Sequence, residues 1–570
     1  MSFEVFYPMS RAGFFFWLGF IGVVYAIVCG WILERQTPKT RLLSGDEAPV
    51  LADFSTCNVE PPDFSCEREF FFGLATAPAH VEDKLNDSWL EFAQEKRFNV
   101  RAWHNIPQPD ERLRFWSNPE VELKLAKETG VSVFRLGIDW GRIVIAEPVN
   151  GIEQVVDKAA VEQYKKILKS VLDHGMRVML TLFHHSLPKW ALPYGGWTDT
   201  RTIKYFTEFA RFADENFGEY VDYWVTFNEP HIFALLTHCS GTWPPGVRLS
   251  LFSSLLCFSP LGDYGKAIRA ISSAHVAAYD VLHERNPKAV VGVAHHVGVI
   301  KPYGFLDIPA SLLSKWLTQF HWIDLIQNHL DFCGINYYGQ EILSAAGLML
   351  DEREEYSEAG RGVYPNGLLE ILEAFHDRYR TRKPELRYII TENGFSDARD
   401  ILRRSYLIEH LLAVSTALKK GIPIDGYIHW TISDNWEWAD GYCPKFGLVS
   451  VDRFNDLRRV PRPSYYLYQQ IVRGRRVTRQ IRVEAWDVLQ KEVRRGSMRP
   501  FCRGFDAHGR MWADGLDTPA MRAYSAKDWR FGEYQSPGIV IYAGRSLDVL
   551  RILASDIIKA LKNLIASDKH

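Results

Sequence analysis

Two glutamates stand in short polar motifs that each follow an apolar run: Glu229 in TFNEP and Glu392 in ITENG. Two carboxyl groups about 5 to 5.5 Å apart can cleave a glycosidic bond with retention. One attacks the anomeric carbon, while the other protonates the leaving oxygen and then acts as the base. Arg135, in FRLGID, would keep the attacking carboxylate ionised. Either glutamate alone could be a structural ion pair, so the hypothesis of glycoside chemistry requires that both meet in one pocket.

Eight short apolar runs, rich in β-branched and aromatic residues, could bring these side chains together. The segments between the runs have helical patterns, as in 161–174, so the sequence predicts an α/β fold of the (β/α)8 TIM barrel type. The runs start at Phe70, Val133, Arg177, Tyr223, Val290, Phe332, Tyr388 and Gly426. Barrel enzymes form their active sites at the carboxyl ends of the strands. The polar residues at those ends are His80, Arg135, His184, Asn228, Glu229, His295, His296, Asn336, Tyr338, Glu392, Asn393 and Asp434.

The composition is that of a folded globular protein. The chain has 570 residues, of which 47% are hydrophobic, and 67 basic against 69 acidic side chains give a net charge of −2. This balance argues against a dedicated nucleic-acid binder, so no nucleic-acid partner is expected. The eight cysteines form no C-x-x-C pair, which indicates neither a metal site nor a disulfide-dense scaffold.

Residues 1–35 form a predicted membrane anchor. The 22 residues between Arg11 and Glu34 carry no charge, and as a helix they would span about 33 Å, enough to cross a bilayer. The alternative is a cleaved signal peptide, but its apolar stretch usually has only about 7 to 15 residues and ends in small residues. Here the run ends in Trp31, Ile32 and Leu33.

Three further regions follow the predicted anchor. Residues 36–65 are interpreted as a linker, 66–475 as the catalytic barrel and 476–570 as a basic C-terminal extension that ends in an amphipathic helix. The basic surface is either a solvated face or a patch on anionic lipid headgroups. The last helix, with Leu550 and Ile557 in its apolar stripe, either packs on the barrel, which we favour, or lies on a membrane.

From about Phe70 to Val472 the chain resembles glycoside hydrolase family 1. The resemblance is carried by TFNEP, ITENG, FRLGIDWGRI, DFCGINYYG and WTISDNWEWADGYCPKFGL, in this order. It implies that Glu229 is the acid/base and Glu392 the nucleophile, and that Arg135 and Tyr338 touch the nucleophile. We also count Asn336, at a strand end, as substrate-binding. The other sugar-binding side chains implied are His184, Asn228, Trp430, Glu437 and Trp438.

Two departures from the family pattern point to one branch of it. His80 stands where the family usually has a sugar-binding Gln, and Ser186 where it usually has Asp. His80 is either a packing residue or, as we favour, a sugar contact. With these departures, the chain resembles the SENSITIVE TO FREEZING type galactolipid:galactolipid galactosyltransferases of the plastid outer envelope. The segments that also carry this resemblance are FFFGLATAPAH, GRGVYPNGL, RPFCRGFDAH and KDWRFGEYQ.

This resemblance implies a membrane-anchored retaining transglycosylase. It would move galactose from one monogalactosyldiacylglycerol to another galactolipid, releasing diacylglycerol, at the chloroplast outer envelope membrane. Its partners would be the galactolipid donor and acceptor and the bilayer. The chemistry would require no cofactor, although Mg²⁺ could stimulate it. The alternatives are a β-glycosidase acting on soluble or lipid-linked glycosides, an inactive sugar-binding or scaffold protein, and a location in the ER or a secretory membrane.

Overall fold

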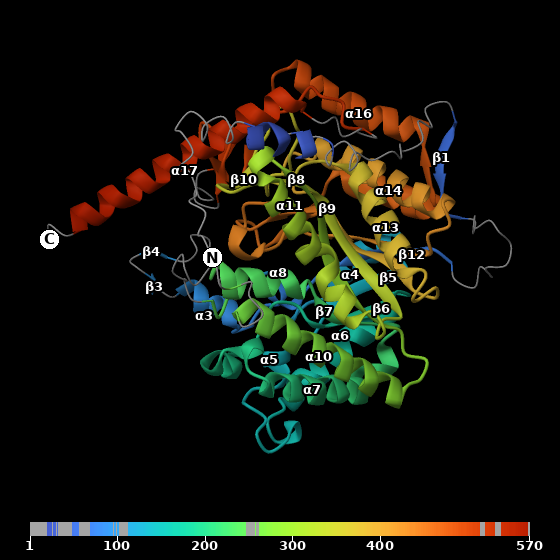
Figure 1. Cartoon of the computed structure of the whole chain (residues 1–570). Helices are drawn as coiled ribbons and strands as arrows, with labels where there is room; N and C mark the ends of the chain where they lie inside the picture. The colour runs from blue at the N-terminus through green and yellow to red at the C-terminus, as the bar shows by residue number, and fades with distance from the viewer. Residues whose placement is uncertain are drawn as a thin grey trace, which may run out of the picture.

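The computed structural model describes most of the chain. The described residues are 20–25, 27–29, 31, 48–55, 69–94, 96–97, 100–101, 112–246, 257, 262–512, 519–530 and 537–567. Figure 1 shows a central barrel with helices around it and further helices at its upper edge. The division of the chain at residues 35, 65 and 475 stays a prediction.

The central sheet is a closed barrel of eight parallel strands, as predicted. Each of the eight predicted runs contains one strand, and β8 and β9 pair to close the ring. A short ninth strand, β10 (Gly347–Met349), adds to β9 in the antiparallel direction. The barrel strands in spatial order are β2 (Phe71–Ala75), β5 (Val133–Gly137), β6 (Arg177–Phe183), β7 (Tyr223–Asn228), β8 (Val291–Pro302), β9 (Phe332–Ser344), β11 (Arg387–Asn393) and β12 (Ile424–His429).

The strands are mainly apolar and buried on both faces because the barrel interior and the helical layer cover them. Every residue of β2, β5, β7 and β12 is buried. The strands also approach closely: a Cβ on Gly334 of β9 would lie 2.3 Å from the carbonyl oxygen of Val293 on β8. The outer helices that follow successive strands include α4 (Glu120–Thr129), α6 (Lys158–Asp173), α7 (Arg201–Phe217), α10 (Asp263–Arg285), α12 (Trp322–Ile326), α13 (Pro365–Tyr379), α14 (Leu402–Lys419) and α15 (Pro463–Gly474).

The chain segments before and after the barrel are attached to it and to each other. Strand β1 (Val50–Asp53) pairs with β15 (Arg476–Thr478). Helix α16 (Arg479–Arg494) packs on α14, and its Arg482 Nε donates to Glu409 Oε1 over 2.7 Å in a buried ion pair. Strand β16 (Met498–Phe501) pairs with β19 (Ala520–Ala523). The basic segment after the barrel therefore contributes structural contacts as well as exposed charge.

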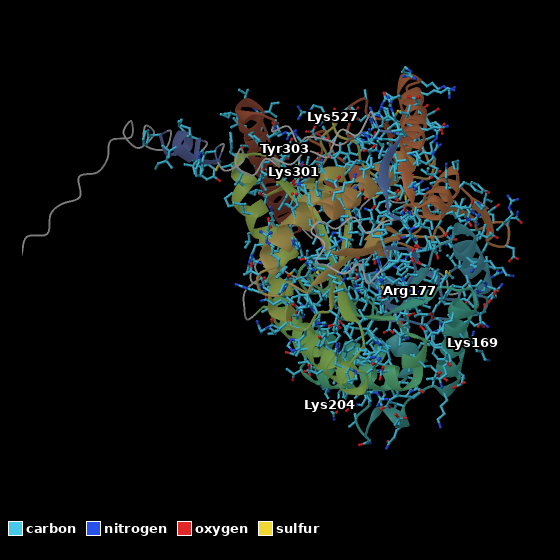
Figure 2. All side chains as sticks on the ribbon, turned by 90° about the vertical axis from the view of Figure 1, so that its right-hand side faces the viewer. Lys169, Arg177, Lys204, Lys301, Tyr303 and Lys527 are labelled. Carbon is cyan, nitrogen blue, oxygen red and sulfur yellow. A yellow bond between two sulfur atoms is a disulfide. The ribbon has the colours of Figure 1, made fainter. Side chains whose placement is uncertain are left out.

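The last helix, α17 (Ile539–Ser567), packs on the body of the protein, as we favoured, but only part of the predicted stripe takes part: Leu553 packs there, beside Val549 and Ile552. Val549 and Ile552 are buried against Tyr303, which Figure 2 shows beside this helix. Leu550 and Ile557 of the predicted stripe are instead 51% and 60% exposed. Our preferred interpretation, that this stripe packs on the barrel, is wrong for these residues. The helix contacts the parts of β8 and β9 that extend beyond the barrel rim, and those contacts decide which of its residues are buried.

The predicted anchor lies mostly outside the described residues. Within the described part of the chain, no helix combines the length and the apolar character that crossing a membrane needs. The described residues between 20 and 31 are helical. Tyr25 donates its hydroxyl to the carbonyl of Phe305 over 3.1 Å, and Cys29 packs with Phe305, Ile308 and Tyr542. This segment therefore lies beside α17, as Figure 1 also shows.

Candidate active site

Glu392 lies near the end of β11 and is held at both carboxylate oxygens. Arg135 of β5 donates from Nη1 to Oε1 over 2.5 Å, and Tyr338 of β9 donates its hydroxyl to Oε2 over 2.6 Å. The side chains of Arg135 and Glu392 are almost wholly buried. An anion fixed by two charge-assisted hydrogen bonds has a defined direction of attack. This geometry suits the predicted nucleophile.

Glu229 follows the last residue of β7 and has a left-handed backbone, with φ of 45°. Such a conformation costs a non-glycine residue free energy and is typical of functional sites. Pro230 begins helix α8 (Pro230–Ala234) directly after it. The Glu229 carboxylate accepts from Asn336 Nδ2 over 2.8 Å, and His296 Nδ1 lies 3.3 Å from the same oxygen.

A continuous hydrogen-bond network joins the two glutamates. Arg135 Nη2 donates to Asn228 Oδ1 over 2.7 Å, and Asn336 Nδ2 donates to the same oxygen over 3.1 Å. Asn336 also binds Glu229, whereas Arg135 also binds Glu392. The predicted pair is therefore brought together at the carboxyl ends of the strands in one polar site.

The two carboxylates influence each other's protonation. Burial raises the pKa of Glu392, and the charge of Glu229 raises it further, while Arg135 and Tyr338 oppose this shift. Burial also acts to raise the pKa of Glu229, but His296, His185 and Asn336 together lower it to about 2. A proton shared by the pair therefore favours Glu392. Arg135 acts on Glu392 in the predicted direction, although burial outweighs it.

The remaining predicted sugar-binding residues form an aromatic wall beside the carboxylates. His80, on the short helix α2 (Pro78–Val81), contacts the carbonyl of Trp436 and lies 4.2 Å from Trp438 and 5.0 Å from Trp430 between ring centroids. Trp430 donates its indole N–H to Glu437 Oε1 over 3.2 Å. The wall therefore joins residues that follow β2 and β12.

Burial shifts the pKa values of two ionisable side chains in this wall, His80 and Glu437. Burial lowers the pKa of His80 to about 3 and raises that of Glu437 well above its ordinary value. His80 is therefore neutral near neutral pH, and burial favours the protonated form of Glu437. Among the described residues, Nε2 of His80 has no hydrogen-bond partner. A sugar hydroxyl would satisfy this buried atom, in keeping with the predicted sugar contact.

His184 connects the wall to the catalytic network. It follows β6, and its Nε2 accepts from Asn228 Nδ2 over 3.1 Å. Its ring is nearly parallel to that of Trp430, with centroids 6.0 Å apart. All eleven predicted site residues thus gather at one end of the barrel. Their individual roles in catalysis and binding stay predictions.

Three residues at this site had no predicted role. His185 accepts a hydrogen bond from Asn228 Nδ2 over 3.3 Å, and His296 contacts Glu229. The charge of Glu229 acts on the guanidinium of Arg361. The two histidines belong to HH doublets, a signal that the sequence does contain. His185 follows the end of β6, whereas His296 was predicted at a strand end but lies within β8, which continues to Pro302. Arg361 lies in a loop, where no strand end marks it. Among the described residues, no group of three or more His, Cys, Asp or Glu side chains could hold a metal ion.

Comparisons with known proteins agree with this site. The sequence profile of Glycosyl hydrolase family 1 matches residues 65–310 and 316–477. The chain is 49% identical over 555 residues to the Arabidopsis thaliana protein named "Galactolipid galactosyltransferase SFR2, chloroplastic", covering 89% of this chain and 88% of that one. It is 45% identical over 573 residues to "Beta-glucosidase-like SFR2, chloroplastic" of Oryza sativa subsp. japonica, with 87% and 88% covered.

A solved structure shows the same barrel. The crystal structure of the hyperthermophilic β-glucosidase from Pyrococcus furiosus superposes with a TM-score of 0.63 at 25% identity, covering 73% of this chain and 97% of that one. With a closed (β/α)8 barrel, two linked glutamates at its rim and a family profile that matches most of its length, this chain belongs to glycosyl hydrolase family 1.

Proposed function

We propose that this protein is a galactolipid galactosyltransferase that works by double displacement, with Glu392 as nucleophile and Glu229 as acid/base. The observation that carries the proposal is the 49% identity, over 89% of the chain, to a plant protein named for this activity. The linked carboxylates supply the chemistry that such a transfer needs.

In the first step, Glu392 attacks the anomeric carbon of a β-galactosyl lipid and the bond to the glycerol oxygen breaks. Glu229 gives its proton to that oxygen, which leaves as the hydroxyl of diacylglycerol. In the second step, a hydroxyl of another galactolipid attacks the galactosyl–Glu392 ester. Its proton passes to Glu229, and the Glu392 carboxylate is restored. The product is a di- or oligogalactolipid.

Exposed apolar side chains support a lipid-linked substrate. They gather on the helical residues between 20 and 31, on α11 (Ile308–Lys315) with the turn after it, and on α17. These segments adjoin one another, and α17 packs on the extensions of β8 and β9 beyond the rim. The apolar residues are Ile21, Val23, Ile27, Trp31, Leu313, Trp316, Leu547, Leu550, Ile557 and Ile558. The active site would therefore open toward a bilayer on which these residues rest.

Location and cofactor use follow from the same proposal. The two plant relatives are both named as chloroplastic, which supports attachment to the chloroplast outer envelope membrane, with residues 1–35 as the anchor. The chemistry requires no cofactor, because carboxylates alone perform both steps. Mg²⁺ would act on lipid headgroups rather than on the reacting bond.

A β-glycosidase acting on short glycosides is the second candidate function. It is favoured by the names of more distant relatives, such as "Beta-glucosidase A" of Thermotoga maritima, which is 28% identical over 460 residues. Since both activities use the same carboxylates, the acceptor decides between them.

Lipid product analysis tests the proposal. The purified full chain is placed in bilayers of monogalactosyldiacylglycerol, and diacylglycerol, oligogalactolipid and free galactose are quantified. We expect one diacylglycerol for each galactose added to a galactolipid, and neither product with Glu392→Ala. Free galactose as the main sugar product would contradict transfer and favour the glycosidase. Turnover that survives Glu392→Ala would contradict the mechanism.

A further inference from the structure

Arg361 is a cationic residue near the catalytic pair, and the proposed reaction gives it no role. It belongs to the loop between β10 and α13 and forms an ion pair with Glu341 of β9. Its side chain is 31% exposed, whereas that of Arg135 is 1% exposed. The charges of Asp440 and Glu229 both act on its guanidinium. Arg361 therefore lies within electrostatic range of the acid/base, in a loop attached to β9 close to Tyr338, and part of its surface is open to a ligand.

The backbone holds this arginine in place. Gly362, the next residue, exchanges two hydrogen bonds of 2.9 Å with Gln340 of β9, two residues after Tyr338. Gly360, the preceding residue, has a left-handed φ of 82°, and a Cβ there would lie 3.1 Å from Cδ of Arg503. The loop is thus fixed on both sides, so that Arg361 is held ready for a partner.

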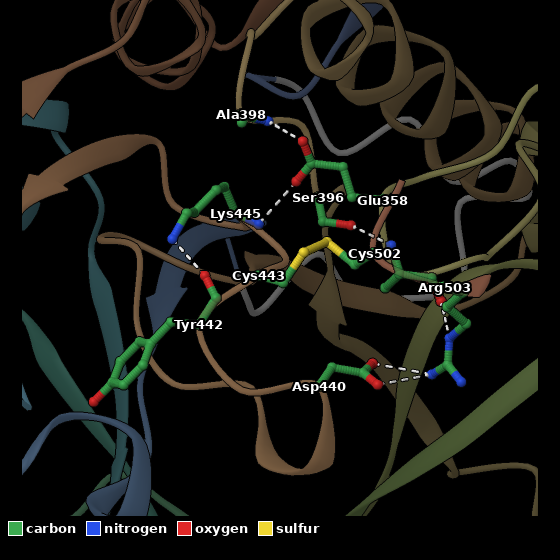
Figure 3. Close-up of a disulfide and its surroundings, with 10 residues drawn as sticks. Glu358, Ser396, Ala398, Asp440, Tyr442, Cys443, Lys445, Cys502 and Arg503 are labelled. Carbon is green, nitrogen blue, oxygen red and sulfur yellow. Dashed lines mark hydrogen bonds and ion pairs between the residues drawn. A yellow bond between two sulfur atoms is a disulfide. The ribbon is translucent and has the colours of Figure 1, made fainter. Parts of the chain in front are cut away.

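The C-terminal extension and the loop after β12 form the far side of this position. Figure 3 shows Arg503 with both oxygens of Asp440, at 3.0 and 3.1 Å. A disulfide between Cys443 and Cys502 joins the same two segments. Asp440 ends the short helix η9 (Trp438–Asp440), which begins with a predicted sugar-binding residue. Arg361 therefore lies near β9 and the extension, and Arg503 of the extension connects its loop to η9 through Ala359 and Asp440.

We propose that Arg361 and Glu341 form the site that binds the galactose of the acceptor lipid. This inference rests on the proposed function and specifies where its second substrate binds. A guanidinium donates two parallel hydrogen bonds to neighbouring hydroxyls, and a carboxylate accepts from a third, which is the chemistry that recognises a sugar rather than water.

The site acts in the second step of the reaction. The attacking acceptor hydroxyl must lie between the galactosyl–Glu392 ester and Glu229, since its oxygen bonds to the anomeric carbon while its proton goes to Glu229. Arg361 and Glu341 would hold the rest of the acceptor ring and increase the fraction of intermediates that meet a sugar before water. They are positioning residues, because they touch neither the bond that forms nor the one that breaks.

The test separates the two steps. The full chain in galactolipid bilayers is assayed for diacylglycerol release, which reports the first step, and for the ratio of oligogalactolipid to free galactose, which reports the second. We expect Arg361→Met to lower this ratio about tenfold, the effect of one charge-assisted hydrogen bond, while diacylglycerol release stays within about threefold of wild type. Glu341→Gln and Arg361→Lys should lower it less. Arg353→Met is the matched control, because Arg353 pairs with Asp351 outside this position.

Each outcome addresses one proposal. Wild-type protein that releases no diacylglycerol from galactolipid would refute the proposed function itself. A ratio that stays at the wild-type value in Arg361→Met, or in Glu341→Gln and Arg361→Lys where the first variant does not fold, would overturn the acceptor site alone. A tenfold fall in Arg353→Met as well would also overturn it, since the effect would then belong to the surface charge.

Discussion

The hydrogen bond from Tyr338 to Glu392 offers a direct test of how the nucleophile is held. Its hydroxyl lies 2.6 Å from Oε2, in a buried site. A hydrogen bond to a charged group contributes about 1.5–3 kcal/mol, and one pKa unit corresponds to about 1.4 kcal/mol. Because Tyr338 stabilises the carboxylate form, Tyr338→Phe should raise the pKa of Glu392 by about one to two units.

The sign of this change can be followed in the pH profile. The first step needs Glu392 ionised and Glu229 protonated, a form in which the pair holds one proton. Because Glu392 has the higher pKa of the two, the alkaline limb of kcat/KM is set mainly by loss of that proton from Glu392. Raising its pKa should therefore move this limb to higher pH and lower the plateau, both measured as the initial rate of diacylglycerol release in galactolipid bilayers. Tyr337→Phe is the matched control: this neighbour on β9 is buried and donates its hydroxyl over 2.6 Å to the carbonyl of Tyr364 instead. An unmoved limb in Tyr338→Phe, or an equal shift in Tyr337→Phe, would refute the reasoning.

Three further predictions use buried ionisable groups. Burial favours the protonated form of Glu437, so Glu437→Gln should retain galactosyl transfer within about threefold while Glu437→Ala loses about tenfold, as steady-state rates would show. His296 lowers the pKa of Glu229, so His296→Asn should increase the share of the pair that carries its proton on Glu229 and raise kcat/KM for diacylglycerol release about tenfold; a fall would contradict the assignment of Glu229 as the acid. Arg482→Met leaves Glu409 buried without its ion pair, which should cost up to about 3 kcal/mol in thermal unfolding above neutral pH, where the carboxylate is ionised. This loss should shrink as the pH falls below the pKa of Glu409, which burial raises to about 7, and a loss independent of pH would exclude the carboxylate as its cause.

The barrel could be predicted from the sequence because each strand is a continuous apolar run. A strand covered on both faces cannot show polar alternation, and a polar residue marks the place where it leaves the barrel. Glu229 and Glu392 both stand at such places, so their meeting followed from closure of the sheet. His296 was predicted to lie at the end of its apolar run, although β8 continues beyond it to Pro302. Its contact with Glu229 depends on the left-handed backbone at Glu229, which no periodicity in the sequence reveals.

The packing of α17 could not be predicted from periodicity alone. Two faces of this helix are apolar, and the more regular one includes Leu550 and Ile557. The buried face contains Ser546, whose hydroxyl accepts from the backbone N–H of Phe305 over 2.8 Å. In a hydrophobic pattern, a small polar residue such as Ser546 predicts a face turned to solvent. Here its hydroxyl instead satisfies a buried backbone N–H. The partner, therefore, and not the helix's own hydrophobicity, determined which face is covered.

The electrostatics of the catalytic pair explain how one site could serve both steps. The charge of Glu229 raises the pKa of Glu392, and by reciprocity the charge of Glu392 opposes ionisation of Glu229. Once Glu392 forms the galactosyl ester it carries no charge, so this opposition ends and the pKa of Glu229 falls. His296, Asn336 and His185 already favour its carboxylate form. Glu229 is then present as the carboxylate that the second step needs as its base, whereas holding a proton for the first step depends on the negative charge of Glu392 opposing the effect of these three side chains.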